Sequence, residues 1–164
     1  MLTPSFETFC QKAEEGNLIP VYREIVADCE TPVSAFLKIR NGLYPFLFES
    51  VEGGEKWGRY SFLGADPSIL IKGEGSRVTM TRKDGGETVT VTPHPLHVLR
   101  DLLSEFKPVD MPGLPRFFGG AVGYLAYDMV RFFEPVHLRP GGTGARHHPC
   151  TGFLVVYHGH PPYF

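Results

Sequence analysis

The sequence has few cysteines, no long apolar run and no excess of positive charge, and each shortage excludes a class of protein. Its three cysteines, Cys10, Cys29 and Cys150, are too few and too scattered for a disulfide framework or a structural zinc site. No apolar run approaches the ~18 residues that a membrane span needs, and the N-terminus has no apolar signal core. The formal net charge of -2 does not supply the positive field that a phosphate backbone requires. We therefore expect a cytoplasmic protein that binds neither nucleic acid nor a membrane.

Apolar residues are plentiful, since 42% of the 164 residues are hydrophobic and 13% are aromatic. The chain can therefore bury a core, and its length suits one globular unit. Two N-terminal segments have helical spacing. The first would begin with Thr3 as its N-cap and Pro4 at its first position and end at Gly16, and the second repeats this device at Thr31 and Pro32. Three apolar residues of the second helix are expected to face inward: Val33, Phe36 and Leu37.

Short apolar runs punctuated by Gly, Pro and Asp predict β-strands. They lie at residues 18–27, 44–51, 60–64 and 69–73. Two further segments, 78–81 and 88–92, alternate apolar residues with threonine around Asp84-Gly85-Gly86. This pattern predicts a β-hairpin whose threonines face outward and leave one face wet.

The second half of the chain adds a helix and another strand. Leucines at helical spacing in residues 96–106 predict an amphipathic helix that packs on the sheet. Residues 116–127, RFFGGAVGYLAY, predict a buried strand in which the glycines allow a bulge or close backbone approach. Because helices and strands do not alternate strictly, the order favours an α+β fold with a largely antiparallel sheet.

The composition changes near Pro135. All 18 Asp and Glu residues lie at or before Glu134, whereas 5 of the 7 histidines lie after it. We expect residues 1–134 to form one domain and residues 135–164 to form an atypical tail. Four histidines of the tail are candidates for a divalent metal site: His147, His148, His158 and His160. Because His-rich tracts are commonly only compositional, we assign no metal ligand to them.

The sequence contains no assembled catalytic motif. It has no GxSxG, no HExxH, no P-loop and no dinucleotide fingerprint. The glycine-rich run FFGGAVGY lacks the lysine and the following helix of a phosphate loop, so it is interpreted as a sheet segment. We therefore assign no catalytic residue.

The most informative stretch is residues 47–64, LFESVEGGEKWGRYSFLG, in which two strands flank a polar turn. Glu49 and Ser50 end one strand, and Arg59 and Ser61 begin the next. A carboxylate binds an ammonium group, an arginine binds a carboxylate, and a hydroxyl both donates and accepts. This set suits an amino-acid ligand. The alternative is a local ion pair among polar groups at the end of a hairpin.

Three ordered motifs carry a family resemblance. They are IPVYREIVADCETPVSAFLKI, LFESVEGGEKWGRYSFLGADP and FFGGAVGYLAYDMVRFFE. Together, within residues 3–134, they resemble the N-terminal region of anthranilate synthase component 1. The resemblance implies a truncated N-terminal part of that fold, a sandwich of largely antiparallel sheets with flanking helices. The related aminodeoxychorismate synthase component 1 is an alternative, although the LxES and GRYSFLG forms are more similar to the anthranilate branch.

The resemblance also implies a function. Family members are lyases that convert chorismate into anthranilate and pyruvate for tryptophan biosynthesis, with ammonia that a glutamine amidotransferase subunit releases from glutamine. Their motifs line an allosteric site at which L-tryptophan binds and inhibits. The matching residues here are Phe48, Glu49, Ser50, Arg59 and Ser61. The chorismate-binding and Mg2+-binding residues of the family lie in a long C-terminal region, so we expect no catalytic or metal-binding residue in this chain.

The tail departs from the family pattern. After YDMVRFFE the family continues with an acidic linker and an apolar strand, whereas this chain has a basic segment rich in His, Pro and Gly. Only FLVVYHGH is similar to the expected strand. We therefore hypothesise a frameshift near Pro135 or a truncated gene. Two functions stay open: the regulatory part of an enzyme that is inactive alone, and a stand-alone amino-acid-binding or interaction module.

Overall fold

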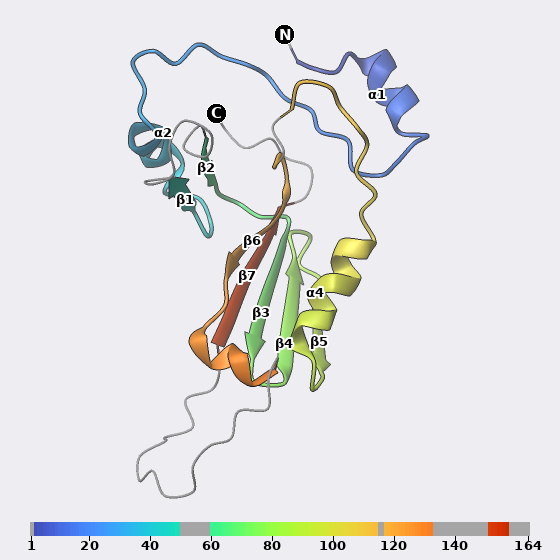
Figure 1. Cartoon of the computed structure of the whole chain (residues 1–164), viewed down its shortest axis with the longest axis vertical. Coiled ribbons are helices and arrows are strands. Elements are labelled where there is room, and N and C mark those ends of the chain that lie inside the picture. Colours follow the sequence, from blue (N-terminus) through green and yellow to red (C-terminus); the bar gives the residue numbers. More distant parts are fainter. Residues whose placement is uncertain (1, 50–59, 115–116, 133–150, 158–164) are drawn as a thin grey trace, which may run out of the picture. The chain divides into compact units, whose positions relative to one another are not determined.

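The computed structural model describes residues 2–49, 60–114, 117–132 and 151–157, the last segment by its backbone. The described residues form two compact units (Figure 1). The first unit lies within residues 2–67 and 108–118. The second lies within residues 68–107 and 119–157. Helices and antiparallel strands occur in the chain together, which confirms the predicted α+β class. The arrangement of the two sheets as a sandwich stays a prediction.

Helix α1 (Phe6–Lys12) begins later than its sequence predicted. Ser5 is the N-cap, because its hydroxyl accepts a hydrogen bond from the Thr8 N–H (3.2 Å). Thr3, the predicted cap, instead exchanges two backbone hydrogen bonds with Tyr22, of 2.8 and 2.7 Å. The prediction of Thr3 as cap was therefore wrong, since a backbone pairing outside the helix holds that residue.

The strand predicted at residues 18–27 does not form. This segment contributes only two isolated bridges, Thr3 with Tyr22 and Leu18 with Pro108. Ile25 and Val26 are 46% and 86% exposed. A run of β-forming residues becomes a strand only where a partner pairs with it, and this one has no continuous partner among the described residues.

Helix α2 (Pro32–Ile39) confirms the predicted start. The Thr31 hydroxyl accepts from the Ser34 N–H (3.0 Å), and the Thr31 N–H donates to the Ser34 hydroxyl (2.8 Å), which is a reciprocal capping box. Its inward face differs from the prediction. Ala35 is the buried residue, whereas Val33 and Leu37 are each 50% exposed. The strands β1 (Phe46–Glu49) and β2 (Ser61–Gly64) pair antiparallel and contact α2.

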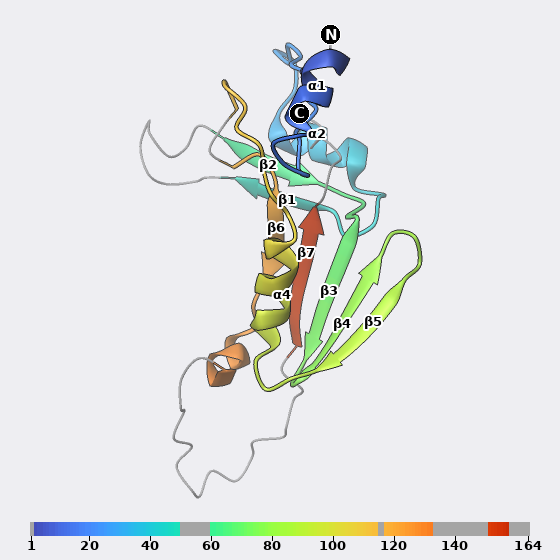
Figure 2. The ribbon, with the colours of Figure 1, turned by 90° about the vertical axis from the view of Figure 1, so that its right-hand side faces the viewer.

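The second unit contains a five-stranded antiparallel sheet in the order β5-β4-β3-β7-β6 (Figure 2). Its strands are β3 (Ile69–Glu74), β4 (Arg77–Arg82), β5 (Glu87–Val91), β6 (Gly120–Tyr124) and β7 (Thr151–Tyr157). The predicted β4–β5 hairpin is confirmed. The Arg82 N–H donates to the Gly86 carbonyl (2.8 Å), and Gly85 has a φ of 89°, a value that favours glycine.

The core of the second unit lies between this sheet and helix α4 (Pro95–Ser104), which Figure 2 shows alongside the strands. Ile69, Ile71, Val78 and Leu102 form its buried cluster. The predicted helix at residues 96–106 is thus confirmed, and it packs on the sheet as expected. A short 3-10 helix, η1 (Tyr127–Phe132), follows β6.

The outward orientation predicted for the hairpin threonines is wrong for Thr90, which is half-buried, whereas Thr88 is exposed near the end of β5. In the register, Thr90 pairs with the buried Val78 and Thr88 pairs with Met80, which packs against the core. Side chains of paired residues lie on the same face, so these threonines share the face that α4 covers. Val89 and Val91 lie on the other face and are 40% and 71% exposed.

Within the segment predicted as a buried strand, residues 116–127, Gly120–Tyr124 form β6, an edge strand of the described sheet. Among the described strands β6 pairs with β7 alone, and Tyr124 at its end is 56% exposed. Gly120 has a φ of 133°, a conformation that favours glycine, whereas a Cβ at Gly119 would meet no atom within 4 Å. The positive φ therefore explains the glycine at position 120. Close packing does not explain the glycine at position 119.

Strand β7 comes from the segment predicted to be an atypical tail. It lies between β3 and β6, with Ile71 opposite Leu154 and Val122 opposite Val155. Residues 133–150, which precede it, lie outside the described residues, and the domain boundary at residue 134 stays a prediction.

Candidate functional site

The predicted ligand residues belong to the β1–β2 hairpin of the first unit. Glu49 is the last residue of β1 and Ser61 is the first of β2, and the two are directly paired in the register. Ser50 and Arg59, the other two polar residues of the predicted set, lie outside the described residues. The hairpin therefore joins a carboxylate and a hydroxyl at the end of two strands, as the sequence spacing predicted.

Glu49 and Ser61 share one face of this small sheet. Side chains alternate along a strand, so the pair Leu47 and Leu63 lies on the same face as Glu49 and Ser61. Leu63 is only 4% exposed, so this face is covered near its middle, and Glu49 at its end is exposed. The polar pair thus adjoins an apolar surface while keeping access to solvent.

Phe48 lies on the opposite face. It pairs with Phe62, and its ring stands 5.4 Å from the ring of Phe46. Phe62 in turn contacts Phe117 edge-on at 5.2 Å. The structure brings Glu49 and Ser61 together, but it does not bring Phe48 to their face. The two-residue period of a strand was the sequence signal that could have shown this.

A carboxylate and a hydroxyl placed opposite each other can both accept hydrogen bonds from one cation. Cβ atoms of directly opposed residues in an antiparallel pair are about 4.5–5.5 Å apart. A cation between them can donate one hydrogen bond to the carboxylate and another to the hydroxyl. Hydrogen bonds of this kind, with an ionised partner, are roughly twice as strong as neutral ones.

Sequence reasoning missed Asp66, which lies near the other end of the hairpin. Its carboxylate accepts a hydrogen bond from the Leu43 N–H (2.8 Å), and its own N–H donates to the Leu43 carbonyl (2.8 Å). An Asp-Pro pair directly after a strand is a turn signal, and it was present in the motif SFLGADP. The contact spans 23 positions, so the partner could not be read from local sequence.

One carboxyl group of the first unit has a shifted pKa. Hydrogen bonds from Lys38 and Ser34 hold the pKa of Glu30 below its ordinary value. The Ser34 hydroxyl donates to Glu30 Oε2 at 2.6 Å, and Lys38 also forms an ion pair with Glu30. Glu30 precedes the N-cap of α2, so this cluster supports the helix and takes no part in the Glu49–Ser61 pair.

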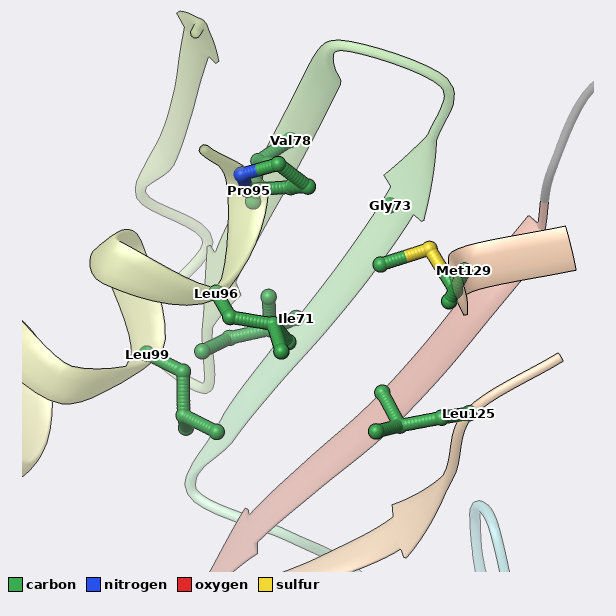
Figure 3. Close-up of a pocket in the computed structure, with 8 residues that line it drawn as sticks. All are labelled: Ile71, Gly73, Val78, Pro95, Leu96, Leu99, Leu125 and Met129. Carbon is green, nitrogen blue, oxygen red and sulfur yellow. The ribbon is translucent and has the colours of Figure 1, made fainter. Parts of the chain in front are cut away.

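The second unit holds a small hollow between α4, β3 and η1 (Figure 3). Its volume is ≈ 20 Å³, room for about one water molecule. The residues that line it are all apolar: Ile71, Gly73, Val78, Pro95, Leu96, Leu99, Leu125 and Met129. It offers no charged or hydroxyl group to a substrate.

The structure gives no support for a metal site among the described residues. His147, His148, His158 and His160 lie outside the described residues. The rings of His94 and His97 stand 4.9 Å apart. Within the part of the chain that the structure describes, no three His, Cys, Asp or Glu side chains gather as a metal site would need. In the same part, no helix is long and apolar enough to cross a membrane.

Comparison with known proteins identifies the family. The chain is 46% identical over 136 residues to anthranilate synthase component 1 of Synechocystis, an alignment that covers 82% of this chain and 27% of the relative. It is 40% identical over 160 residues to anthranilate synthase component 1 of Acetivibrio thermocellus, covering 96% of this chain and 32% of the relative. The chain carries an N-terminal region of the anthranilate synthase component 1 family. No protein-family model matches it.

The match to anthranilate synthase component 1 covers most of this chain but only part of each relative. The chain spans about a third or less of the length of these relatives, including that of Aquifex aeolicus, of which it covers 27% at 43% identity. The alignment with the Acetivibrio relative covers 96% of this chain, so the similarity extends into residues 135–164. The frameshift or truncation hypothesised near Pro135 stays a prediction.

Proposed function

We propose that this chain is the regulatory region of an anthranilate synthase component 1 and that the end of the β1–β2 hairpin binds L-tryptophan. The pairing of Glu49 with Ser61 supports the proposal, because it provides two hydrogen-bond acceptors for one ammonium group. Similarity to the component 1 family supports tryptophan as the amino acid, since the product of that enzyme feeds tryptophan synthesis.

The proposed contacts divide by chemistry. Glu49 accepts from the ligand ammonium, Ser61 and Ser50 add hydroxyl contacts, and Arg59 binds the ligand carboxylate. Phe48 lies on the face opposite to Glu49, so we propose that it packs with the aromatic residues of that face rather than sharing the ammonium site.

The proposal for the whole enzyme goes further than this region. The complete component 1 would act in the cytoplasm as a lyase, converting chorismate and ammonia into anthranilate and pyruvate. A glutamine amidotransferase subunit would supply the ammonia. Mg2+ would serve the reaction in the complete enzyme, but the described residues do not fit a magnesium site, so none of them is given that role. Residues 1–134 would be the regulatory domain. The catalytic residues would lie in the part of a complete component 1 that does not align with this chain.

The test measures inhibition by tryptophan in a complete component 1 that carries this region. Anthranilate fluorescence reports turnover with chorismate, Mg2+ and ammonium. Glu49→Gln removes the charged acceptor and should raise the inhibition constant about tenfold to a hundredfold, because a hydrogen bond to a charged group contributes about 1.5–3 kcal/mol. Glu87→Gln, at an exposed glutamate of β5, is the matched control. Equal inhibition constants for wild type and Glu49→Gln would refute the assignment.

A second measurement tests whether this region lacks the catalytic activity of the complete enzyme. The 164-residue chain alone is mixed with chorismate, Mg2+ and ammonium. We expect no anthranilate fluorescence, since no catalytic group is assigned to it. Turnover by this chain alone would contradict the proposed division between regulatory and catalytic regions.

A further inference from the structure

The base of the β1–β2 hairpin is closed by a side chain. The ladder of paired residues runs from Glu49–Ser61 to Phe46–Gly64. The next residue of the first strand is Pro45, which has no N–H to donate, so the ladder does not continue through it. Beyond Pro45, the Leu43 N–H donates to Asp66 Oδ1 and the Asp66 N–H donates to the Leu43 carbonyl, both at 2.8 Å. These two bonds close the end of the hairpin that is remote from Glu49.

The closure holds an unusual backbone. Asp66 has a φ of 56° and Tyr44, next to Leu43, has a φ of 50°. Aspartate tolerates this left-handed conformation better than most residues, because its short polar side chain can bond locally. A tyrosine there is uncommon, so its conformation depends on surrounding contacts. The Asp66–Leu43 bonds hold the chain at Leu43, the residue next to Tyr44, and at Asp66 itself.

A glycine makes room for the closure. A Cβ at Gly42 would lie 2.8 Å from the Ala65 Cβ and 2.8 Å from Asp66 Oδ2. Real Cβ atoms do not approach other atoms so closely, so any larger residue would displace the Asp66 carboxylate or the chain beside it. Gly42, Leu43 and Asp66 therefore act together.

The closure at the base of the hairpin affects which face of the small sheet carries Glu49. A two-stranded sheet is marginal by itself, and a slip of one residue moves every side chain to the other face. Such a slip would carry Glu49 to the face of Phe48 and separate it from Ser61. We propose that Asp66 is a positioning residue for the amino-acid site: it fixes the β1–β2 register and so keeps Glu49 opposite Ser61. This inference rests on the proposed function.

The experiment compares three variants in a complete component 1 that carries this region. Asp66→Gly keeps the backbone freedom and removes the carboxylate. Asp66→Asn keeps an acceptor oxygen and a residue that tolerates positive φ. Asp84→Gly is the matched control, since the Asp84 carboxylate also accepts from a backbone N–H, that of Gly86 (3.0 Å), in the β4–β5 turn. Two quantities are measured: the inhibition constant for tryptophan against the KM for chorismate, and hydrogen exchange of amides in residues 43–49 and 60–66.

Asp66→Gly should raise the inhibition constant about twofold to tenfold, the range for one hydrogen bond, and raise it more than the KM. It should also speed exchange in both segments. In Asp66→Asn, the inhibition constant and the exchange rates should stay within about twofold of those of the wild type. Asp84→Gly should change neither.

Three outcomes would overturn the inference. The first is unchanged amide exchange in Asp66→Gly. The second is a loss of inhibition in Asp66→Asn equal to that in Asp66→Gly. The third is a parallel loss of inhibition and turnover in Asp66→Gly, which would make Asp66 only a scaffold residue. Glu49→Gln, measured beside them, separates the two proposals. If Glu49→Gln weakens inhibition but Asp66→Gly does not, the positioning role alone fails. If Asp66→Gly speeds exchange but Glu49→Gln leaves inhibition unchanged, the proposed tryptophan site fails.

Discussion

The two hairpins β1–β2 and β4–β5 are closed in different ways. The β4–β5 turn is local: Gly85 adopts a positive φ and Arg82 bonds Gly86 within five residues. The closure described for β1–β2 lies at the opposite end of its hairpin, the base, and joins Leu43 to Asp66, 23 positions apart. A local turn needs only its own residues, whereas a remote closure depends on the fold around it. The register of β1–β2 therefore depends in part on a contact that is remote in the sequence.

Burial differs between the same regions. In the second unit, one buried cluster lies between α4 and the sheet: Ile69, Ile71, Val78 and Leu102. In β1–β2, Leu63 is buried, but Phe48 remains 49% exposed and Glu49 is exposed. The continuous core stabilises the larger sheet, and the half-covered hairpin leaves polar groups accessible. A binding role suits the second arrangement.

The largest expected effect comes from the core. Ile71→Ala should lower the free energy of unfolding by about 3–5 kcal/mol, because it opens a cavity in a packed cluster. Leu63→Ala, at a residue with the same 4% exposure, should cost nearer to 2–3 kcal/mol, since fewer buried neighbours surround it. Urea unfolding of the 164-residue chain measures both. A larger loss for Leu63→Ala would reverse the comparison of the two units.

Crowding at the hairpin base gives the next effect. Gly42→Ala places a Cβ against Ala65 and Asp66 and should cost about 1–3 kcal/mol, the usual range for overpacking. Gly75→Ala is a useful comparison, because nothing lies within 4 Å there and its φ of 60° is the only obstacle. Crystallography or NMR of Gly42→Ala should show the Leu43–Asp66 bonds lengthened. Unchanged bonds with unchanged stability would show that the base tolerates a larger residue.

Helix caps should give a smaller change. Thr31→Ala removes one half of the α2 capping box and should lower the free energy of unfolding by about 1 kcal/mol. Ser5→Ala removes the cap of α1, a helix with no buried residue, and should have less effect. Thermal unfolding compares the two variants. Equal losses of unfolding free energy in the two variants would mean that the contribution of a cap does not depend on how well its helix is packed.

The smallest effect is a dependence on pH at Glu30. Its pKa is lowered in the folded state by hydrogen bonds from Lys38 and Ser34, so folding favours the ionised form. The stabilisation is complete above the ordinary value of 4.5 and is lost as the pH falls through the lower folded value. Unfolding of wild type and Glu30→Gln, measured from pH 7 down to pH 3, should converge at the acid end. A constant difference would contradict this linkage.

Much of the fold follows from local sequence signals. Thr31-Pro32 gives the start of α2, Asp84-Gly85-Gly86 gives the β4–β5 turn, and the spacing of residues 47–64 places Glu49 near Ser61. These features need only neighbouring residues. The strand predicted at residues 18–27 failed because a strand requires a partner, which local sequence does not supply. The orientation of Thr90 was wrong for a similar reason, since the position of α4 determines which face is covered.

The candidate site was predictable in part. Its polar pair followed from the turn, and the separation of Phe48 from Glu49 follows from strand alternation. The role of Asp66 depends on a contact over 23 positions and on left-handed backbone at Tyr44, and no local pattern specifies either. Remote contacts of this kind are what the sequence alone left undetermined.

The position of β7 sets an order in which the larger sheet can be completed during synthesis. β3 emerges from the ribosome first, β6 about 50 residues later, and β7, which joins them, emerges last. Until residues 151–157 are available, β3 and β6 each have an open edge facing the missing strand. A nascent chain halted before residue 151 would thus expose two unpaired strand edges, which favour association with other chains. Of these five strands, the one made last lies between β3 and β6 and joins them.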